Sequence, residues 1–333
     1  MATLDVERNI PAKQAPGLTG GWASKRAERW GVILAGGDGT RLRPLTRRIV
    51  GDERPKQFCP ILGRETLLGQ TQRRTALAVP AEQTLVVVTR AHRRFYEYLL
   101  AGLPPDGLVA QPQNRGTAPA ILYALFRLAA LAPTAPVAIF PSDHYVSDDA
   151  AFMAHVEAAF QAVRERPEAV VLLGIAPDSP EEEYGWIEPA DPLTAEPGIV
   201  SRVRRFWEKP SADLARALWA RGCLWNSFVM VGAVSSFLEL IAGAMPSLYH
   251  VFDAVRPTFG TAAEEAAVRD LYARLPETNF SRQVLAASPA ALVVLPVIGV
   301  RWSDWGEPGR VLGTLARIGI TPAWAEGAVP VPA

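Results

Sequence analysis

Cysteine, lysine and long apolar runs are all scarce in this chain of 333 residues. The two cysteines, Cys59 and Cys223, form neither a metal-binding spacing nor a disulfide framework, so a reducing cytoplasm is the expected location. The longest apolar stretches, such as 291–300, are interrupted by proline and are too short to cross a bilayer. The N-terminus lacks the pattern of a secretory leader. We therefore expect no membrane partner.

Charge of either sign is also not in excess. The chain carries 34 basic and 34 acidic residues, so its formal net charge is zero. Without a basic field, a nucleic-acid partner is not expected, and small molecules are the expected ligands. Nearly half of the residues are apolar, which is enough for a globular core. The composition leaves open a homo-oligomer.

Lysine is the most informative scarcity. Only four of the 34 basic residues are lysines, and Lys13 and Lys25 lie in a polar N-terminal stretch. Lys56 and Lys209 lie in the folded body, where arginine supplies nearly all other positive charge. Lysine is a compact charge on a flexible stem and can reach a single phosphate oxygen. We expect these two lysines to serve chemistry, although chance survival is the alternative.

Apolar runs and helix-like segments alternate along the chain after an N-terminal arm of residues 1–28. Short apolar runs near 31–35, 84–88, 108–110, 137–140 and 169–174 predict buried strands, and helical periodicity separates them. This pattern predicts a Rossmann-like α/β fold, with a mixed, mostly parallel sheet and helices on both faces. We expect one domain over 29–321, with halves at about 29–180 and 181–321, and a tail over 322–333.

A glycine-rich loop directly follows the first predicted strand. Three glycines within four positions let backbone N–H groups approach an anion closely, and Arg41 adds a planar fork for phosphate oxygens. The spacing fits neither the Walker A loop nor the dinucleotide fingerprint, which excludes a Rossmann dehydrogenase. The alternative is a tight turn without a ligand. The expected phosphate cradle comprises Leu34, Ala35, Gly36, Gly37, Gly39 and Thr40.

Two further segments place polar groups at the same edge of the sheet. Asp143 ends a buried strand, where a carboxylate suits Mg²⁺, although it could instead cap the following turn. Its neighbour His144 is expected to be structural. Gln111, Asn114, Gly116 and Thr117 precede a helix whose N-terminus offers backbone donors to a ligand. The alternative there is an ordinary helix start, with Thr117 as its cap.

The loop at 34–46 and Pro55-Lys-Gln-Phe58 together resemble the signature of the sugar-phosphate nucleotidyltransferases. Segments 111–121, 141–144, 184–188, 206–210, 224–227 and 302–306 resemble the family's other motifs, in the family's order. The resemblance implies a nucleotidyltransferase fold of the glycosyltransferase-A-like type, with a nucleotide-binding first half and a sugar-binding second half. The form Gly116-Thr-Ala-Pro-Ala120 is similar to guanylyltransferases that use mannose 1-phosphate.

The resemblance also implies a role for each matching residue. Arg41 and Lys56 would hold the triphosphate, Lys209 would neutralise the sugar phosphate, and Asp143 with Asp304 would bind Mg²⁺. Arg41, Lys56, Asp143 and Lys209 are thus the expected catalytic set. Segments 111–117 and 34–40 would bind the nucleotide. The expected sugar-side residues are Gly185, Glu188, Glu208, Lys209 and Asn226.

Several positions depart from the family pattern. Residues 47–53 lengthen the spacing between the first two motifs, and Phe228 stands where glycine is common. Residues 278–282 replace a family segment, and Trp305 also departs. These departures leave the sugar and base open, so glucose 1-phosphate with UTP or dTTP is an alternative pair. A catalytically silent, nucleotide-sugar-binding regulatory subunit is the alternative outside enzymes.

Overall fold

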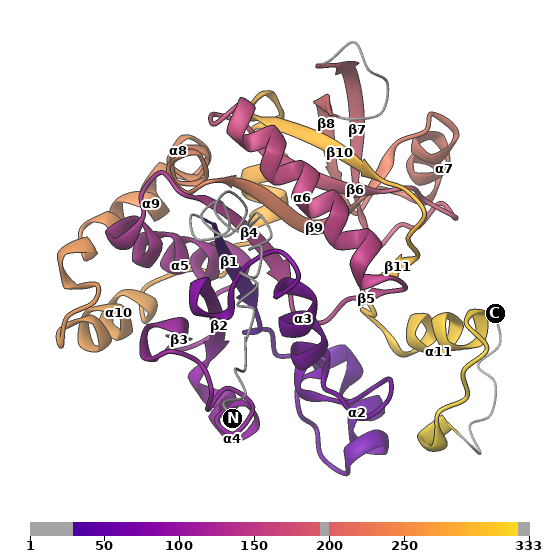
Figure 1. Cartoon of the computed structure of the whole chain (residues 1–333), viewed down its shortest axis with the longest axis horizontal. Helices are drawn as coiled ribbons and strands as arrows, with labels where there is room; N and C mark the ends of the chain where they lie inside the picture. Colours follow the sequence, from indigo (N-terminus) through magenta and orange to yellow (C-terminus); the bar gives the residue numbers. More distant parts are fainter. Residues whose placement is uncertain (1–28, 194–199, 326–333) are drawn as a thin grey trace, which may run out of the picture.

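The computed structural model describes residues 29–193 and 200–325, and its centre is one nine-stranded sheet (Figure 1). The strand order is β3-β2-β1-β4-β9-β6-β10-β8-β7, and β9 also pairs with β7. The expected arm at 1–28 and the tail beyond 325 lie outside the described residues. Within the described chain, no helix combines the length and apolarity needed to span a bilayer.

The sheet is mixed, as the sequence predicts, with parallel pairs on both sides of β9. β1 runs parallel to β2 and β4, and β2 runs parallel to β3. Antiparallel pairing begins where β9 enters between β4 and β6. β6 and β10 then run parallel to each other, and β8 pairs antiparallel with both β10 and β7. The strands are β1 (Trp30–Leu34), β2 (Thr84–Thr89), β3 (Leu108–Gln111), β4 (Pro136–Pro141), β6 (Val170–Ile175), β7 (Gly185–Pro192), β8 (Ser201–Glu208), β9 (Leu224–Ala233) and β10 (Leu292–Val297).

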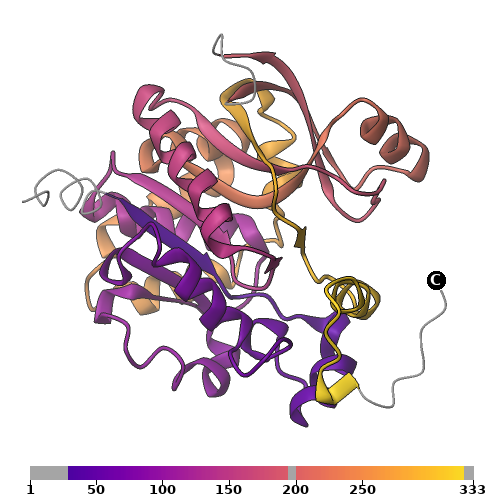
Figure 2. The same ribbon diagram turned by 45° about the vertical axis from the view of Figure 1, so that its right-hand side comes forward.

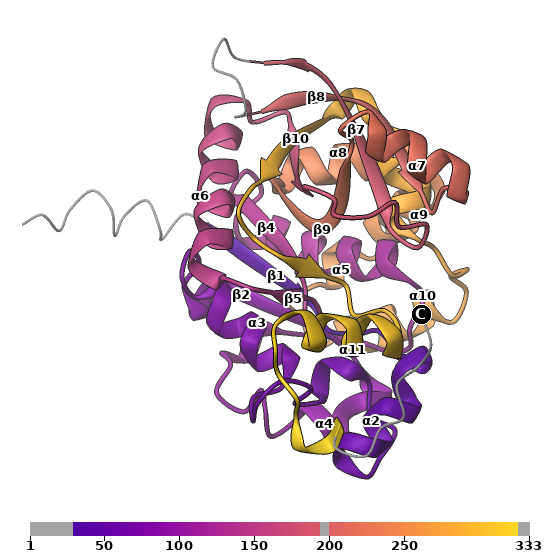
Figure 3. The same cartoon turned by 90° about the vertical axis from the view of Figure 1, so that its right-hand side faces the viewer.

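Helices cover both faces of the sheet because successive strand residues point to opposite sides. Val32 packs with one apolar cluster and its neighbour Ile33 with the other. Figure 3 shows α6 on one side of the sheet and α5, α8 and α9 on the other. The α-helices are α2 (Arg43–Val50), α3 (Leu67–Thr75), α4 (Arg93–Tyr96), α5 (Thr117–Leu131), α6 (Asp149–Glu165), α7 (Ala212–Ala220), α8 (Val234–Ala244), α9 (Pro246–Asp253), α10 (Glu264–Tyr272) and α11 (Pro308–Arg317).

A third, smaller apolar cluster joins the two ends of the described chain. Leu45 of α2 and Leu315 of α11 pack with the buried Trp305, and Figure 2 shows these two helices close together. β5 (Tyr145–Val146) and β11 (Trp302–Ser303) form a two-stranded sheet, and β11 ends two residues before Trp305. The segment after β11 is thereby held against the residues that follow β1, although the two lie near opposite ends of the described chain.

Local sequence explains several of the helix starts. Thr66 caps α3 by accepting a hydrogen bond from Gly69 N–H, and Asp148 caps α6 in the same way through Ala151 N–H. The helix that follows β2 is short, since α4 ends at Tyr96 and turns follow. The sequence analysis did not anticipate α2, whose Pro44 occupies a first-turn position that proline tolerates.

Candidate active site

A cavity of about 760 Å³ opens at the ends of β1, β3 and β4, where their carboxyl ends meet. A second cavity of about 280 Å³ adjoins it and shares Arg41, Asp143, His144 and Asp304 in its lining. Below, these are the central cavity and the side cavity. The predicted residues that line the central cavity are Leu34, Gly36, Gly37, Arg41, Gln111, Asn114, Gly116, Thr117, Asp143, Gly185, Glu208, Lys209, Asn226 and Asp304. Those that line only the side cavity are Gly39, Thr40 and Lys56.

The glycine-rich loop is held in place by hydrogen bonds to its backbone. Gln57 Nε2 donates to the carbonyls of Ala35 and Gly37 at 2.9 and 2.8 Å, and Thr89 Oγ1 donates to that of Gly36 at 2.8 Å. A side chain at Gly36 would displace the buried Gln111 side chain, since an added Cβ would lie 2.5 Å from Gln111 Nε2. Gln57 was not among the predicted site residues. Its place beside Lys56 explains why Pro55-Lys-Gln-Phe58 accompanies the loop.

Lys56 joins the loop region to the segment after β11. Its ammonium group donates to the carbonyls of Asp304 and Trp305 at 2.5 and 3.0 Å and lies 3.4 Å from Asp143 Oδ2. The residue is only 8% exposed. A buried ammonium needs such partners, because an unpaired charge would be strongly destabilising. Lys56 thus links the two predicted metal-binding aspartates.

The two aspartates face the same space and have different partners. Asp304 Oδ1 accepts hydrogen bonds from Gly306 N–H at 2.8 Å and from Arg310 Nη1 at 2.6 Å. Burial raises the pKa of Asp304, but the charges of Lys56 and Arg310 outweigh it, so the pKa lies below its usual value. Among the described residues nothing donates to Asp304 Oδ2. The carboxylate is therefore ionised and retains an oxygen for a ligand.

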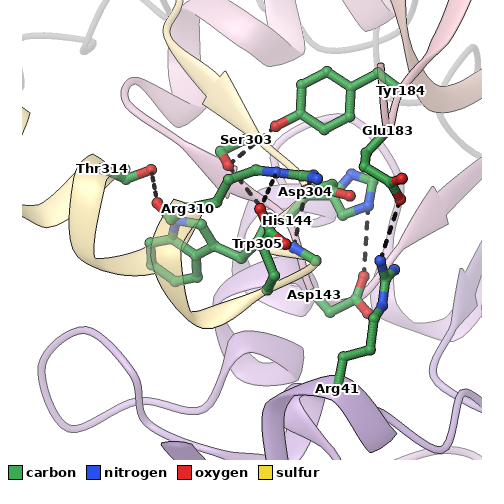
Figure 4. Close-up of polar contacts among 12 residues, drawn as sticks. Arg41, Asp143, His144, Glu183, Tyr184, Ser303, Asp304, Trp305, Arg310 and Thr314 are labelled. Atoms are coloured by element: carbon green, nitrogen blue, oxygen red, sulfur yellow. Dashed lines mark hydrogen bonds and ion pairs between the residues drawn. The ribbon is translucent and has the colours of Figure 1, made fainter. Parts of the chain in front are cut away.

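His144 lies beside Asp143, as Figure 4 shows, with 3.6 Å between Nε2 and Oδ1. Its ring meets Trp302 edge to face, with the centroids 5.1 Å apart. Burial lowers the pKa of His144 to about 4, so the imidazole is neutral at physiological pH. A neutral, packed ring agrees with the expectation of a structural histidine.

A second ion-pair group lies across the cavity and centres on Glu183, which the sequence analysis did not select. Its carboxylate accepts a hydrogen bond from Lys209 Nζ at 2.8 Å and lies 3.5 Å from Arg41 Nη1. Figure 4 shows the Arg41 guanidinium extended toward Glu183. The hydrogen bond from Lys209 lowers the pKa of Glu183 below its usual value. The Glu183 carboxylate is thus paired with two of the three cations predicted to bind phosphate.

The sugar-side predictions divide into two groups. Gly185 and Glu208 are paired across β7 and β8, and both line the central cavity with Asn226 of β9. Glu188 lies outside the lining, because its carboxylate accepts hydrogen bonds from Trp207 Nε1 at 3.2 Å and from Arg221 Nη1 at 3.3 Å. Ala35, buried behind the loop, is likewise not part of the lining of either cavity.

Residues 277–283, the rim segment, form a wall that the sequence did not reveal. Thr278 exchanges backbone hydrogen bonds with Arg115 and Ala118, at 2.9 and 3.2 Å. Phe280 N–H donates to Thr117 Oγ1 at 2.8 Å. The hydroxyl of Thr117 is thus an acceptor for the rim segment, where the alternative in the sequence analysis made it a helix cap. The rim segment fixes the start of α5 at the edge of the cavity.

The profile of the family described as Nucleotidyl transferase matches residues 30–308. The xanthan biosynthesis protein XanB of Xanthomonas campestris pv. campestris (strain B100) is 32% identical over 288 residues, which is 84% of this chain and 58% of that protein. A Klebsiella pneumoniae protein named mannose-1-phosphate guanylyltransferase is 27% identical over 83% of this chain and 58% of its own length. The chain therefore spans little more than half the length of these relatives.

Among solved structures, one described as mannose-1-phosphate geranyltransferase from Thermus thermophilus is similar throughout the fold. It is 30% identical, has a TM-score of 0.73, and aligns with 86% of this chain and 79% of its own. The matched family segment runs from the start of β1 to the start of α11.

Proposed function

Because the chain belongs to the Nucleotidyl transferase family, we propose that it transfers a nucleotidyl group from GTP to mannose 1-phosphate, giving GDP-mannose and pyrophosphate. One observation carries the proposal: Arg41, Lys209 and two aspartates from distant segments line one cavity with the glycine-rich loop. Cations suit the phosphates of both substrates, and the loop's backbone donors suit the triphosphate. The names of the relatives support the choice of sugar and base.

The reaction is an in-line displacement at the α-phosphorus. An oxygen of the sugar phosphate forms the new bond, the bond between the α-phosphorus and the bridging oxygen breaks, and pyrophosphate leaves with that oxygen. The nucleophile is already ionised, so no general base is required. Positioning and charge neutralisation supply the rate enhancement. Lys209 holds the sugar phosphate, while Arg41 and Lys56 stabilise the pyrophosphate.

The donor set fits Mg²⁺, which takes one or two protein carboxylates and completes its shell with water and phosphate oxygens. Asp143 and Asp304 supply the hard oxygen ligands, and both line the two cavities. No group of three or more acidic, histidine or cysteine side chains in the described part of the chain forms a self-sufficient metal site. A bound Mg²⁺ would neutralise charge on the phosphates, and Lys56 keeps the two aspartates together.

The test is pyrophosphate release from a grid of sugar 1-phosphates and nucleoside triphosphates, with Mg²⁺ and with a chelator. We expect mannose 1-phosphate with GTP to be the fastest pair and the chelator to abolish release. A faster pair such as glucose 1-phosphate with UTP or dTTP would overturn the specificity and keep the reaction. Binding of GDP-mannose without turnover of any pair would instead identify a silent regulatory subunit.

A further inference from the structure

Backbone strain in the described part of the chain gathers at this site. Three non-glycine residues there have positive φ, namely Lys209 at 48°, Phe228 at 59° and Trp305 at 46°. A residue with a side chain is strained in this conformation, because its Cβ comes too close to the following carbonyl oxygen. Such strain persists where the surroundings enforce it, and it clusters at functional sites. Lys209 is paired with Glu183, and the carbonyl of Trp305 accepts a hydrogen bond from Lys56. Phe228, in contrast, has no role in the reaction described above.

The conformation of Phe228 is enforced from both sides. Its N–H donates to Asn226 Oδ1 at 3.1 Å. The Ser227 hydroxyl donates to Leu173 O at 2.7 Å and accepts from Val229 N–H at 3.1 Å. The pairing of β9 with β6 also shifts register opposite this point, between Leu172 and Gly174. An irregular strand can re-aim a side chain next to an active site.

The ring of Phe228 is half-buried and forms part of the central cavity wall on the sugar side, with Asn226 and Glu208. It meets the ring of Phe280 edge to face, with the centroids 6.3 Å apart and the planes at 80°. Phe280 is fully buried, and its N–H is bonded to Thr117 at the start of α5. Phe228 is therefore a braced apolar wall in an otherwise polar part of the cavity.

We propose that Phe228 determines which sugar 1-phosphates the site accepts, an inference that rests on the proposed function. A rigid ring discriminates by steric exclusion, and it also offers an apolar surface to the C–H groups of a hexose. Hexoses that carry a bulky N-acetyl group are excluded by this wall, while unsubstituted hexoses are accepted. In this proposal the glycine-rich loop after β1 holds the triphosphate, so we expect triphosphate binding not to depend on the ring of Phe228 in β9.

The experiment compares Phe228→Gly, Phe228→Ala and the unaltered chain. For each, kcat/KM is measured with mannose 1-phosphate, glucose 1-phosphate and N-acetylglucosamine 1-phosphate, using the best nucleoside triphosphate. We expect the preference for the unsubstituted sugars to fall at least about tenfold in both variants, since pocket shape discriminates by about 10–200-fold. The KM for the triphosphate should not change. Trp219→Ala, which removes an exposed aromatic side chain of α7, is the control and should keep the preference.

Glycine and alanine separate the ring from the strain, because both remove the ring but only glycine suits a φ of 59°. An unchanged preference in both variants would overturn the proposal, and so would a change with glycine alone. Melting temperatures show whether each variant folds. If a variant does not fold, Phe228→Leu takes its place, and its sugar preference should lie between that of the unaltered chain and that of the Ala variant. If the unaltered chain turns over no pair, the proposed function fails; calorimetric titration with the same sugar phosphates then tests the wall by binding.

Discussion

The two ends of the central cavity are built in different ways. At the end proposed to bind the nucleotide, the side chains of Gln57 and Thr89, both buried and uncharged, fix the glycine-rich loop by hydrogen bonds to its carbonyls. At the sugar end, Lys209 is held by the exposed carboxylate of Glu183, and Phe228 is held in a strained conformation. The first arrangement leaves little freedom to the chain. In the second, the ion pair of Lys209 with Glu183 is exposed, so it can change with little effect on the strands.

This difference separates reaction from specificity. The parts proposed to bind the triphosphate would have to place several backbone N–H groups within hydrogen-bonding distance of one anion, so small displacements would be costly. The parts proposed to bind the sugar would need only shape and a few polar groups, which different side chains can supply. We therefore expect substitutions at the shared metal and phosphate positions to have the largest effects, and those at the sugar-end ion pairs the smallest.

The largest effect is expected from Asp143→Ala and Asp304→Ala. Each removes a carboxylate from the proposed Mg²⁺ site, and losing one such electrostatic contact costs about 2.7–4 kcal/mol, or about 10²–10³ in kcat. The measurement is pyrophosphate release under saturating substrates, together with the melting temperature. Asp213→Ala, at an exposed ion pair on α7, serves as the control and should retain full activity. Near-normal turnover in either site variant would contradict the metal assignment.

An intermediate effect is expected from Gln57→Met, which keeps the length of the side chain and removes its donors. Two carbonyls of the glycine-rich loop would lose their partner, and an unsatisfied buried acceptor costs about 1–3 kcal/mol. We expect a lower free energy of unfolding and a KM for the triphosphate raised about tenfold, with the KM for the sugar phosphate unchanged. Denaturant unfolding and steady-state kinetics measure both quantities.

Gln70→Met is the matched control for this change. Gln70 Nε2 also donates to two carbonyls, those of Leu62 and Glu65, but at 3.2 Å and outside both cavities. Gln70→Met should lower the free energy of unfolding by less than Gln57→Met does, and both KM values should stay unchanged. If the two variants weaken triphosphate binding equally, the effect comes from general destabilisation and the loop has no special dependence on Gln57.

The nucleotide end could be read from the sequence further than the sugar end. Glycine spacing and the order of strands and helices indicate the mixed sheet and place Gly36, Gln111 and Asp143 at one edge, because each feature is local. Glu183 was missed because its contacts join segments that are far apart in sequence. Gln57 was missed because its side chain donates only to backbone atoms. The departure of Glu188 from the cavity lining has the same origin: its partners, Trp207 and Arg221, lie on other elements.

The smallest effect is expected from Glu183→Gln, and its sign is informative. The carboxylate competes with the sugar phosphate for Lys209 and with the triphosphate for Arg41, so removing its charge should lower the KM for the sugar phosphate. Exposed ion pairs contribute about 0.2–1 kcal/mol, which limits the change to about fivefold. Since the pKa of Glu183 lies below its usual value, the carboxylate stays ionised at neutral pH and the difference should be constant there. A KM that rises instead would mean that Glu183 positions Lys209 for the phosphate, and the sugar end would then be as constrained as the nucleotide end.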